Sequence, residues 1–241
     1  MNDYIRAFLK ALFPQRCAYC GKVISTDTFA CVSCQKVLPR IQDKTCFGCG
    51  REINFCSCKG VRYFISQAAP FYYEGVVRNG LHRFKFRKGQ QNAEAFCNEM
   101  AQTVSQRYAK TNFDCIVAVP MTKKSVRRRG YNQIDILCRA LSEKLNLRYE
   151  SGALIKIYET RKQHGISRIL RKGNLTGVFD VSDPEIIKGK TILLCDDIST
   201  SGETFNECAK MLWLNGAKEV RCISVALTKQ TKNKTDIHII D

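Results

Sequence analysis

The sequence predicts an α/β fold, in which a doubly wound and mostly parallel sheet follows a small cysteine-rich module. From about residue 61 onward, continuous apolar segments alternate with amphipathic ones, as strands alternate with helices in a parallel sheet. Eight of the 14 cysteines lie between residues 17 and 58, in closely spaced pairs. Hydrophobic residues make up 44% of the 241, which supports a packed core and excludes wholesale disorder. We therefore expect two domains, residues 1–60 and 61–241.

The N-terminal segment "MNDYIRAFLKALFPQR" is expected to form a short helix that ends at Pro14. Its apolar residues recur every four positions, as they do on one face of a helix. Arg6 and Lys10 interrupt the apolar stretch, so the segment does not have the pattern of a secretory signal. We expect its apolar face to pack on the neighbouring domain, and a helix lying on a membrane surface is the alternative.

No apolar run in the sequence approaches the roughly 18 residues that are needed to span a bilayer. Without such a run or a secretory signal, the sequence predicts a cytoplasmic protein with no transmembrane segment. Association with a membrane through the N-terminal helix is the alternative.

The paired cysteines stand in the segments "CAYC", "CVSC", "CFGC" and "CSC". Two residues between cysteines let both thiolates bind one metal ion from a tight turn, and two such turns complete a tetrahedral zinc site. A disulfide framework is the competing interpretation, which a reducing compartment disfavours. Because four thiolates leave no open position for water, we predict two structural zinc ions. In sequence order, Cys17, Cys20, Cys31 and Cys34 bind one ion, and Cys46, Cys49, Cys56 and Cys58 bind the other.

Pairing in sequence order is the simplest assignment, and an interleaved assignment stays open. The last pair has one residue between its cysteines where the others have two, so the second site is the less regular one. The remaining six cysteines stand among apolar residues and are expected to be core side chains.

The second domain is predicted from five segments. Residues 114–120, 190–197 and 219–228 are apolar strands, and residues 132–146 and 204–217 have helical spacing. Gly216 is expected to end the second of these helices. In a doubly wound sheet, ligands bind beyond the carboxyl ends of the strands.

The stretch "LLCDDISTSG" is placed where such a ligand binds. The backbone N–H groups and hydroxyls of residues 199–204 can surround a phosphate at the start of a helix. Asp196 and Asp197 cannot bind that phosphate, but they suit vicinal hydroxyls or a divalent cation. A phosphate site beside a diol site indicates a ribose 5-phosphate. The alternative is an ordinary strand, loop and helix with acids on the surface.

This stretch closely resembles the signature of phosphoribosyltransferases, which bind phosphoribosyl pyrophosphate (PRPP). The resemblance implies that Asp196 and Asp197 act as the catalytic acids and contact the ribose hydroxyls, with Mg²⁺ accompanying PRPP. It also implies that the following loop holds the 5-phosphate. The implied PRPP-binding residues in this stretch are Asp196, Asp197, Ser199, Thr200, Ser201, Gly202, Glu203 and Thr204.

The order of motifs along nearly the whole chain is similar to that of the ComF family. The cysteine pairs are followed by "RRRGYNQ" at residues 127–133, by "TRKQHGISRILRKGNLTGVF" at residues 160–179, and then by the acidic pair. The resemblance implies a double zinc ribbon joined to a type I phosphoribosyltransferase-like domain, and a role in DNA uptake and natural transformation. Ser199 departs from the pattern, because a bulkier apolar residue is more common there.

The resemblance also assigns the basic segments. Residues 123–129 should form a loop that faces the pyrophosphate, and residues 161–172 should form the flexible loop that closes over it. Lysine and arginine side chains there would stabilise negative charge as pyrophosphate leaves. Lys123, Lys124 and Arg161 therefore join the expected PRPP-binding residues.

The formal net charge of +17 predicts a polyanionic partner. Segments 82–88, 123–129 and 161–172 hold 14 of the 39 basic residues and no acid, more than one pyrophosphate requires. Single-stranded DNA fits this excess, and a basic surface that serves only solubility is the alternative. The aromatic residues Tyr63, Phe84, Phe86 and Tyr131 either stack on bases or lie in the core. The predicted DNA-binding residues are Lys85, Arg127, Arg128, Arg129, Arg168, Arg171 and Lys172.

Three functions are compatible with these features. The first is a DNA-uptake factor that binds PRPP, single-stranded DNA and other proteins of the uptake machinery. The second is a metabolic phosphoribosyltransferase that acts on an unidentified small base or amine. The third is a non-catalytic regulator that senses PRPP and binds DNA. His82 and His164 have no partner pattern for acid–base catalysis, and we expect both on loops or on the surface.

Overall fold

The computed structural model describes residues 14–24, 28–42, 44–56, 58, 62–86, 92–157 and 178–230. The predicted N-terminal helix lies outside the described residues. So do four of the basic residues assigned from the sequence: Arg161, Arg168, Arg171 and Lys172.

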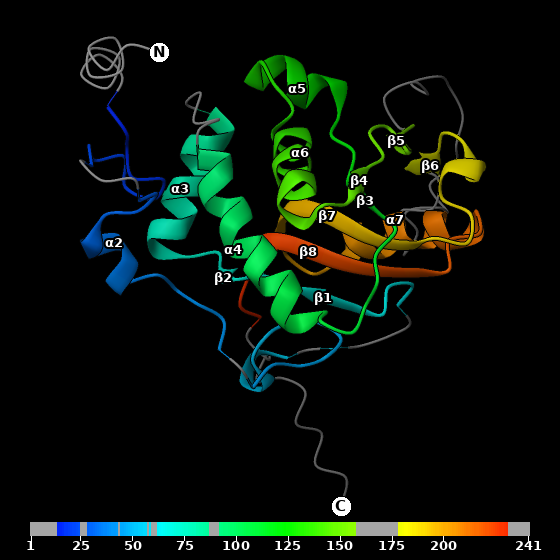
Figure 1. Ribbon diagram of the computed structural model, residues 1–241, viewed down its shortest axis with the longest axis horizontal. Coiled ribbons are helices and arrows are strands. Elements are labelled where there is room, and N and C mark those ends of the chain that lie inside the picture. The colour runs from blue at the N-terminus through cyan, green and yellow to red at the C-terminus, as the bar shows by residue number, and fades with distance from the viewer. Residues whose placement is uncertain are drawn as a thin grey trace, which may run out of the picture.

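A mostly parallel sheet forms the centre of the molecule, as the sequence predicts (Figure 1). Its strands follow the order β1-β8-β7-β3-β4, and β2 also pairs with β8. All of these pairings are parallel. The strands are β1 (Ser66–Ala68), β2 (Phe71–Tyr72), β3 (Cys115–Ala118), β4 (Arg148–Tyr149), β7 (Thr191–Ser199) and β8 (Glu219–Leu227).

Helices cover both faces of this sheet (Figure 1). On one face, Leu193 and Cys195 of β7 pack in a cluster with side chains of α3 (Gly75–Phe86), α4 (Asn92–Arg107) and α6 (Gln133–Leu145). On the other face, Ile192 and Leu194 pack against α7 (Glu203–Leu214). Successive side chains of a strand point to opposite faces, which is why neighbouring residues of β7 belong to different clusters.

Short elements complete the fold. The strands β5 (Leu154–Lys156) and β6 (Phe179–Val181) form a separate antiparallel pair. The cysteine-rich module contains the helix α2 (Val32–Lys36) and the 3₁₀ turn η1 (Ile53–Phe55), and a second 3₁₀ turn, η3 (Pro184–Ile186), precedes β7.

The first half of the cysteine-rich module shares its core with the larger domain. Cys17 and Tyr19 are buried in the same cluster as Phe71 and Phe96. The Tyr19 ring lies edge-on to these two rings, at centroid distances of 6.0 and 5.9 Å. The module is therefore packed against the sheet and α4, and its folding contributes directly to the main core.

Two expectations about secondary structure were wrong. Residues 123–129 form a helix, α5 (Lys123–Arg129), and not a loop. Thr122 caps its start by accepting a hydrogen bond from the Ser125 N–H, and Gly130, at φ 80°, ends it. The strand β7 also continues to Ser199, because it pairs with β8 along its whole length.

Within the described ranges, no helix has both the length and the apolar character that crossing a membrane requires.

Candidate functional site

Two groups of four cysteines form candidate zinc centres. Within each group the sulfur atoms lie within 4.8 Å of one another, and the groups are Cys17, Cys20, Cys31 and Cys34, and Cys46, Cys49, Cys56 and Cys58. This grouping confirms the pairing in sequence order.

The spacing of the sulfur atoms fits zinc. A tetrahedral site with Zn–S bonds of about 2.3 Å separates its sulfurs by about 3.8 Å. The Sγ atoms of Cys20 and Cys31 are 3.7 Å apart, and those of Cys46 and Cys58 are 3.6 Å apart. The Sγ atoms of Cys56 and Cys58 are closer, at 3.3 Å. Four thiolates within 4.8 Å of one another can fill the coordination of one zinc ion, and both centres are structural zinc sites of a double zinc ribbon.

The local backbone favours the thiolate form at one cysteine of each centre. Burial opposes ionisation of Cys17, but the N–H groups of Cys20, Cys31 and Tyr19 lower its pKa to about 6. The pKa of Cys46 is lowered to about 6 in the same way, against the effect of burial. Thiolates are the form that binds zinc, and within each centre the backbone favours this form at one cysteine. Burial raises the pKa of Cys20 and Cys34 in the first centre and of Cys49 and Cys58 in the second.

The acidic pair lies inside β7 and not at its end, because the strand continues two residues beyond the predicted end at residue 197. Asp197 is 5% exposed. Its Oδ1 is 3.0 Å from the Lys85 ammonium, and its Oδ2 accepts a hydrogen bond of 2.8 Å from the Gln133 side chain. Both oxygens of this acid are therefore engaged by α3 and α6 of the same chain.

The position of Lys85 corrects its assignment to the DNA surface. Its side chain is 16% exposed, and its charge compensates the buried Asp197 carboxylate. An ammonium held in this way belongs to the acidic pair and not to an open basic face.

Asp196 is the more accessible of the two acids. Its Oδ1 accepts a hydrogen bond of 2.7 Å from the Asp197 N–H, and within the described residues no side chain donates to it. Burial and the charge of Asp197 raise the pKa of Asp196 well above the usual value, and the charges of Lys85 and Arg129 oppose this rise. Asp196 therefore has a carboxyl group that no side chain of the described residues donates to.

The loop after β7 leads into α7. Gly202, at φ 88°, occupies the cap position before Glu203, a left-handed conformation that L side chains rarely adopt. Thr200, Ser201 and Thr204 are exposed. The first N–H groups of α7 have no carbonyl partner within the helix, and such a helix start can bind an anion. The Glu203 N–H donates to the Ser201 hydroxyl at 3.4 Å.

The Ser199 hydroxyl is not available to a phosphate, contrary to expectation. Ser199 is 4% exposed, and its Oγ donates a hydrogen bond of 2.9 Å to the side-chain oxygen of Gln67. The hydroxyl is used to attach the end of β7 to β1.

Three side chains of this region were not identified from the sequence: Arg51, Gln67 and Gln133. Arg51 donates to the carbonyl oxygens of Thr200 and Thr228, residues more than a hundred positions away. Gln133 ends the "RRRGYNQ" motif, which was the one available signal for it. The other two have no local pattern, because their roles depend on which segments the fold brings together.

An exposed basic face lies on α5. Lys123, Lys124, Arg127 and Arg128 are exposed, whereas Arg129 is only partly so. Arg129 is also near enough to Asp196 for its charge to lower that acid's pKa. Arg129 is therefore shared between the basic face and the acidic pair.

One aromatic ring lies against this face. Phe86, at the end of α3, is 47% exposed, and the guanidinium groups of Arg128 and Arg129 lie 5.9 and 5.3 Å from its ring centroid. Phe84 is fully buried, at 5.7 Å from Phe96, so it is a core residue and does not stack on bases. Tyr131 packs near Phe84, at 6.4 Å between ring centroids.

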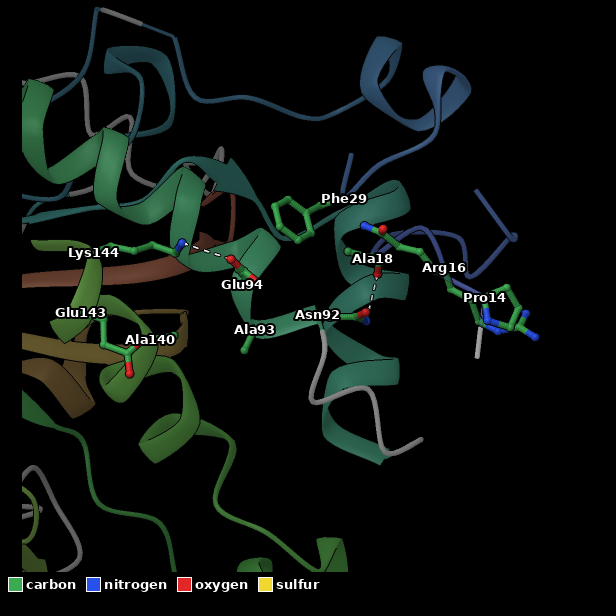
Figure 2. A pocket seen from close by; sticks show the side chains of 11 residues that line it. Pro14, Arg16, Ala18, Phe29, Asn92, Ala93, Glu94, Ala140, Glu143 and Lys144 are labelled. Atoms are coloured by element: carbon green, nitrogen blue, oxygen red, sulfur yellow. Dashed lines mark hydrogen bonds and ion pairs between the residues drawn. The ribbon is translucent and has the colours of Figure 1, made fainter. Parts of the chain in front are cut away.

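A separate cavity of about 560 Å³ lies between the first cysteine centre, α4 and α6 (Figure 2). Lys144 and Glu94 form an ion pair of 3.6 Å beside it, and the Asn92 amide donates to the Ala18 carbonyl. Its α6 residues begin at Ala140, seven positions after Gln133, which is roughly 10 Å along a helix. The cavity is therefore distinct from the acidic pair, which Gln133 contacts.

Comparison with known proteins identifies two regions of the chain. Residues 88–241 match the phosphoribosyl transferase domain family, and residues 8–62 match the double zinc ribbon domain family. The DNA utilization protein YhgH of Escherichia coli O6:H1 (strain CFT073) is 30% identical over 208 residues, which cover 85% of this chain and 87% of that protein.

Two competence proteins are also similar. The competence protein ComFC of Streptococcus pneumoniae is 25% identical over 229 residues, covering 87% of this chain and 99% of that protein. The ComFC of Bacillus subtilis is 26% identical over 207 residues, covering 80% and 82% respectively.

Proposed function

The chain belongs to the phosphoribosyltransferase domain family and, with its double zinc ribbon, to the ComF family, and on this premise we propose that it binds PRPP and supports DNA uptake. The names of the relatives, a DNA utilization protein and competence proteins, support the second part of this proposal. Other proteins of the DNA-uptake machinery are the expected partners.

The observation that supports PRPP binding is a half-buried acid, Asp196, close in sequence to the start of α7. Asp196 has a carboxylate without a side-chain donor in the described residues, and the loop that follows leads into α7. In the proposed complex, Asp196 accepts hydrogen bonds from the ribose hydroxyls, and the N–H groups of residues 201–204 bind the 5-phosphate. Mg²⁺ accompanies the pyrophosphate.

Asp197 has a different role in this proposal. Because Lys85 and Gln133 already occupy its two oxygens, Asp197 positions these side chains and the backbone of Asp196. Lys85 and Arg129 place positive charge near the acidic pair, where a bound pyrophosphate would otherwise be repelled.

A glycine substitution tests the proposed phosphate site in residues 199–204, which are called the phosphate loop below. In Gly202→Ala, the positive φ becomes unfavourable by about 1–2 kcal/mol, so the loop shifts and PRPP affinity falls by about tenfold. Gly189→Ala is the matched control, because Gly189 also has a positive φ and open space for a Cβ, at the amino-terminal end of β7. Calorimetric titration with PRPP and Mg²⁺ measures both. Equal weakening in the two variants would contradict a phosphate site at Gly202.

The exposed face of α5 supports binding of single-stranded DNA. Arg127 and Arg128 lie on that face, and the partly exposed Phe86 ring beside it offers a surface on which a base can stack. In this proposal, DNA phosphates follow the basic helix while PRPP occupies the acidic pair.

Arg127→Ala/Arg128→Ala is expected to weaken binding of single-stranded DNA and to flatten its salt dependence. Each lost phosphate contact should reduce the slope of log affinity against log salt by about 0.7. Lys188→Ala/Lys218→Ala removes the same charge from exposed positions near the amino-terminal ends of β7 and β8, and should leave the slope unchanged. Fluorescence anisotropy across a salt series measures this. An equal effect in both variants would indicate attraction by net charge alone.

The two alternative functions are separated by measuring pyrophosphate release from PRPP, with and without single-stranded DNA. A metabolic phosphoribosyltransferase would release pyrophosphate with a small base or amine and would not depend on DNA. A non-catalytic regulator would bind both ligands and release none.

A further inference from the structure

The second zinc centre lies next to the loop that follows β7. Arg51 comes two positions after the zinc ligand Cys49 and is 1% exposed. Its Nε donates a hydrogen bond of 2.7 Å to the Thr228 carbonyl, and its guanidinium also donates to the Thr200 carbonyl. Burying an arginine costs free energy unless its N–H groups find hydrogen-bond acceptors. Here the acceptors are the Thr200 carbonyl of the phosphate loop and the Thr228 carbonyl, which directly follows β8.

The contact with Thr200 determines which way the next N–H points. In a planar trans peptide, the C=O of one residue and the N–H of the next point in opposite directions. Because Arg51 holds the Thr200 oxygen toward the zinc ribbon, the Ser201 N–H is directed away from Arg51. The Thr228 hydroxyl, at 3.3 Å, supports the same orientation of the Thr200 carbonyl.

Gln67 of β1 makes a second connection between the second zinc centre and the phosphate loop. Its side-chain NH₂ donates to the Cys49 carbonyl at 2.9 Å, and its side-chain oxygen accepts from the Ser199 hydroxyl at 2.9 Å. The backbone is equally close, since a Cβ on Gly50 would lie 2.3 Å from the Gln67 carbonyl oxygen. The residues between Cys46 and Arg51 therefore rest directly on β1.

The side chains of Arg51 and Gln67 border a small cavity. A cavity of about 60 Å³ lies between the second zinc centre and the loop, lined by Cys49, Arg51, Gln67 and Ser201 among others. The hydrogen bonds of the Arg51 and Gln67 side chains link the two sides of this cavity.

We propose that Arg51 and Gln67 are positioning residues for the phosphate loop, and that zinc in the second centre maintains the loop in its binding conformation. Zinc holds the turn between Cys46 and Cys49 in shape, and Arg51 and Gln67 transmit that shape to Ser199 and Thr200. The expected consequence for PRPP affinity rests on the proposed function.

Hydrogen exchange of the loop tests the proposal without any ligand. Arg51→Met keeps the volume of the side chain and removes its donors. The peptide that covers residues 199–206 should exchange faster in this variant by about tenfold, while the zinc content stays at two per chain. Arg51→Lys keeps the charge and part of the donor capacity, and should show a smaller acceleration. PRPP affinity should fall in the same order, by about tenfold for Arg51→Met.

Arg40→Met is the matched control. Arg40 also joins the ribbon to the larger domain, through a two-pronged ion pair with Glu99 of α4, but it does not touch the loop. Neither loop exchange nor PRPP affinity should change in this variant. Unchanged loop exchange in Arg51→Met, with zinc retained, would overturn the role of Arg51.

The zinc dependence is tested with Cys58→Ser, which removes an exposed ligand of the second centre. The loss of one zinc should accelerate exchange in the same loop peptide to the extent seen in Arg51→Met. Slow exchange after zinc loss would overturn the link between zinc and loop. If wild-type protein fails to bind PRPP, the proposed function is wrong, but loop exchange still decides whether the second zinc centre positions the loop.

Discussion

Asp196→Asn is expected to lose PRPP binding without loss of thermal stability, whereas Asp197→Asn is expected to destabilise the fold itself. Hydrogen bonds to a charged acceptor contribute roughly 1.5–3 kcal/mol each, so Asp196→Asn should weaken PRPP binding by at least about tenfold. The variant also removes a negative charge that burial and Asp197 disfavour, so its melting temperature should equal or exceed that of wild type.

The pH dependence of stability provides an independent test. A carboxyl whose pKa is raised by folding binds its proton more tightly in the native state than in the unfolded state. Its contribution to stability is therefore present below the unfolded pKa of about 4 and is lost as the pH rises through the raised pKa of Asp196. The stability advantage of Asp196→Asn over wild type should grow over this interval, as measured by thermal melts across pH. A constant difference would contradict the raised pKa.

Asp197→Asn has a different consequence, because it leaves the Lys85 ammonium largely buried without its counter-charge. We expect a loss of about 2–3 kcal/mol, somewhat below the value for fully buried pairs because Lys85 is 16% exposed. Lys85→Met/Asp197→Asn removes both charges and should recover much of this loss. Chemical denaturation of the single and double variants measures the coupling. Equal stability of Asp197→Asn and wild type would contradict the buried ion pair.

Loss of the first zinc ion is expected to destabilise the whole protein. Cys17 and Tyr19 belong to the main core, so without the metal that holds this turn, the Tyr19 ring loses its place against Phe71 and Phe96. Cys17→Ser should therefore lower the free energy of unfolding by about 3–5 kcal/mol, the cost of removing a large buried aromatic. It should also reduce the zinc content from two ions to one.

Two cysteine variants serve as controls for this effect. Cys208→Ser changes a buried cysteine of α7 that belongs to neither centre, and should retain two zinc ions. Cys58→Ser should lose one zinc ion with a smaller fall in melting temperature, because Cys58 is exposed. Zinc analysis and thermal melts distinguish the three variants. Two zinc ions and wild-type stability in Cys17→Ser would contradict the structural role of the first centre.

The features that the sequence determined by itself are local. The two zinc ligand sets follow from spacings of one or two residues, because neighbouring thiolates on a tight turn reach the same ion. The parallel sheet and the helices on both of its faces follow from the periodicity of apolar residues. The loop before α7 is recognisable because small residues follow an apolar strand, although its ligand remains a proposal.

The tertiary structure decided which distant side chains meet. The Lys85–Asp197 ion pair depends on how α3 packs against β7, and the contact between Arg51 and Thr200 joins residues 149 positions apart. Phe84 and Phe86 look alike in the sequence, but one is buried and the other is 47% exposed because they face different sides of α3. Periodicity specifies which face of an element is apolar. It does not specify the angle and position at which elements pack, and these determine the partners of a buried charge.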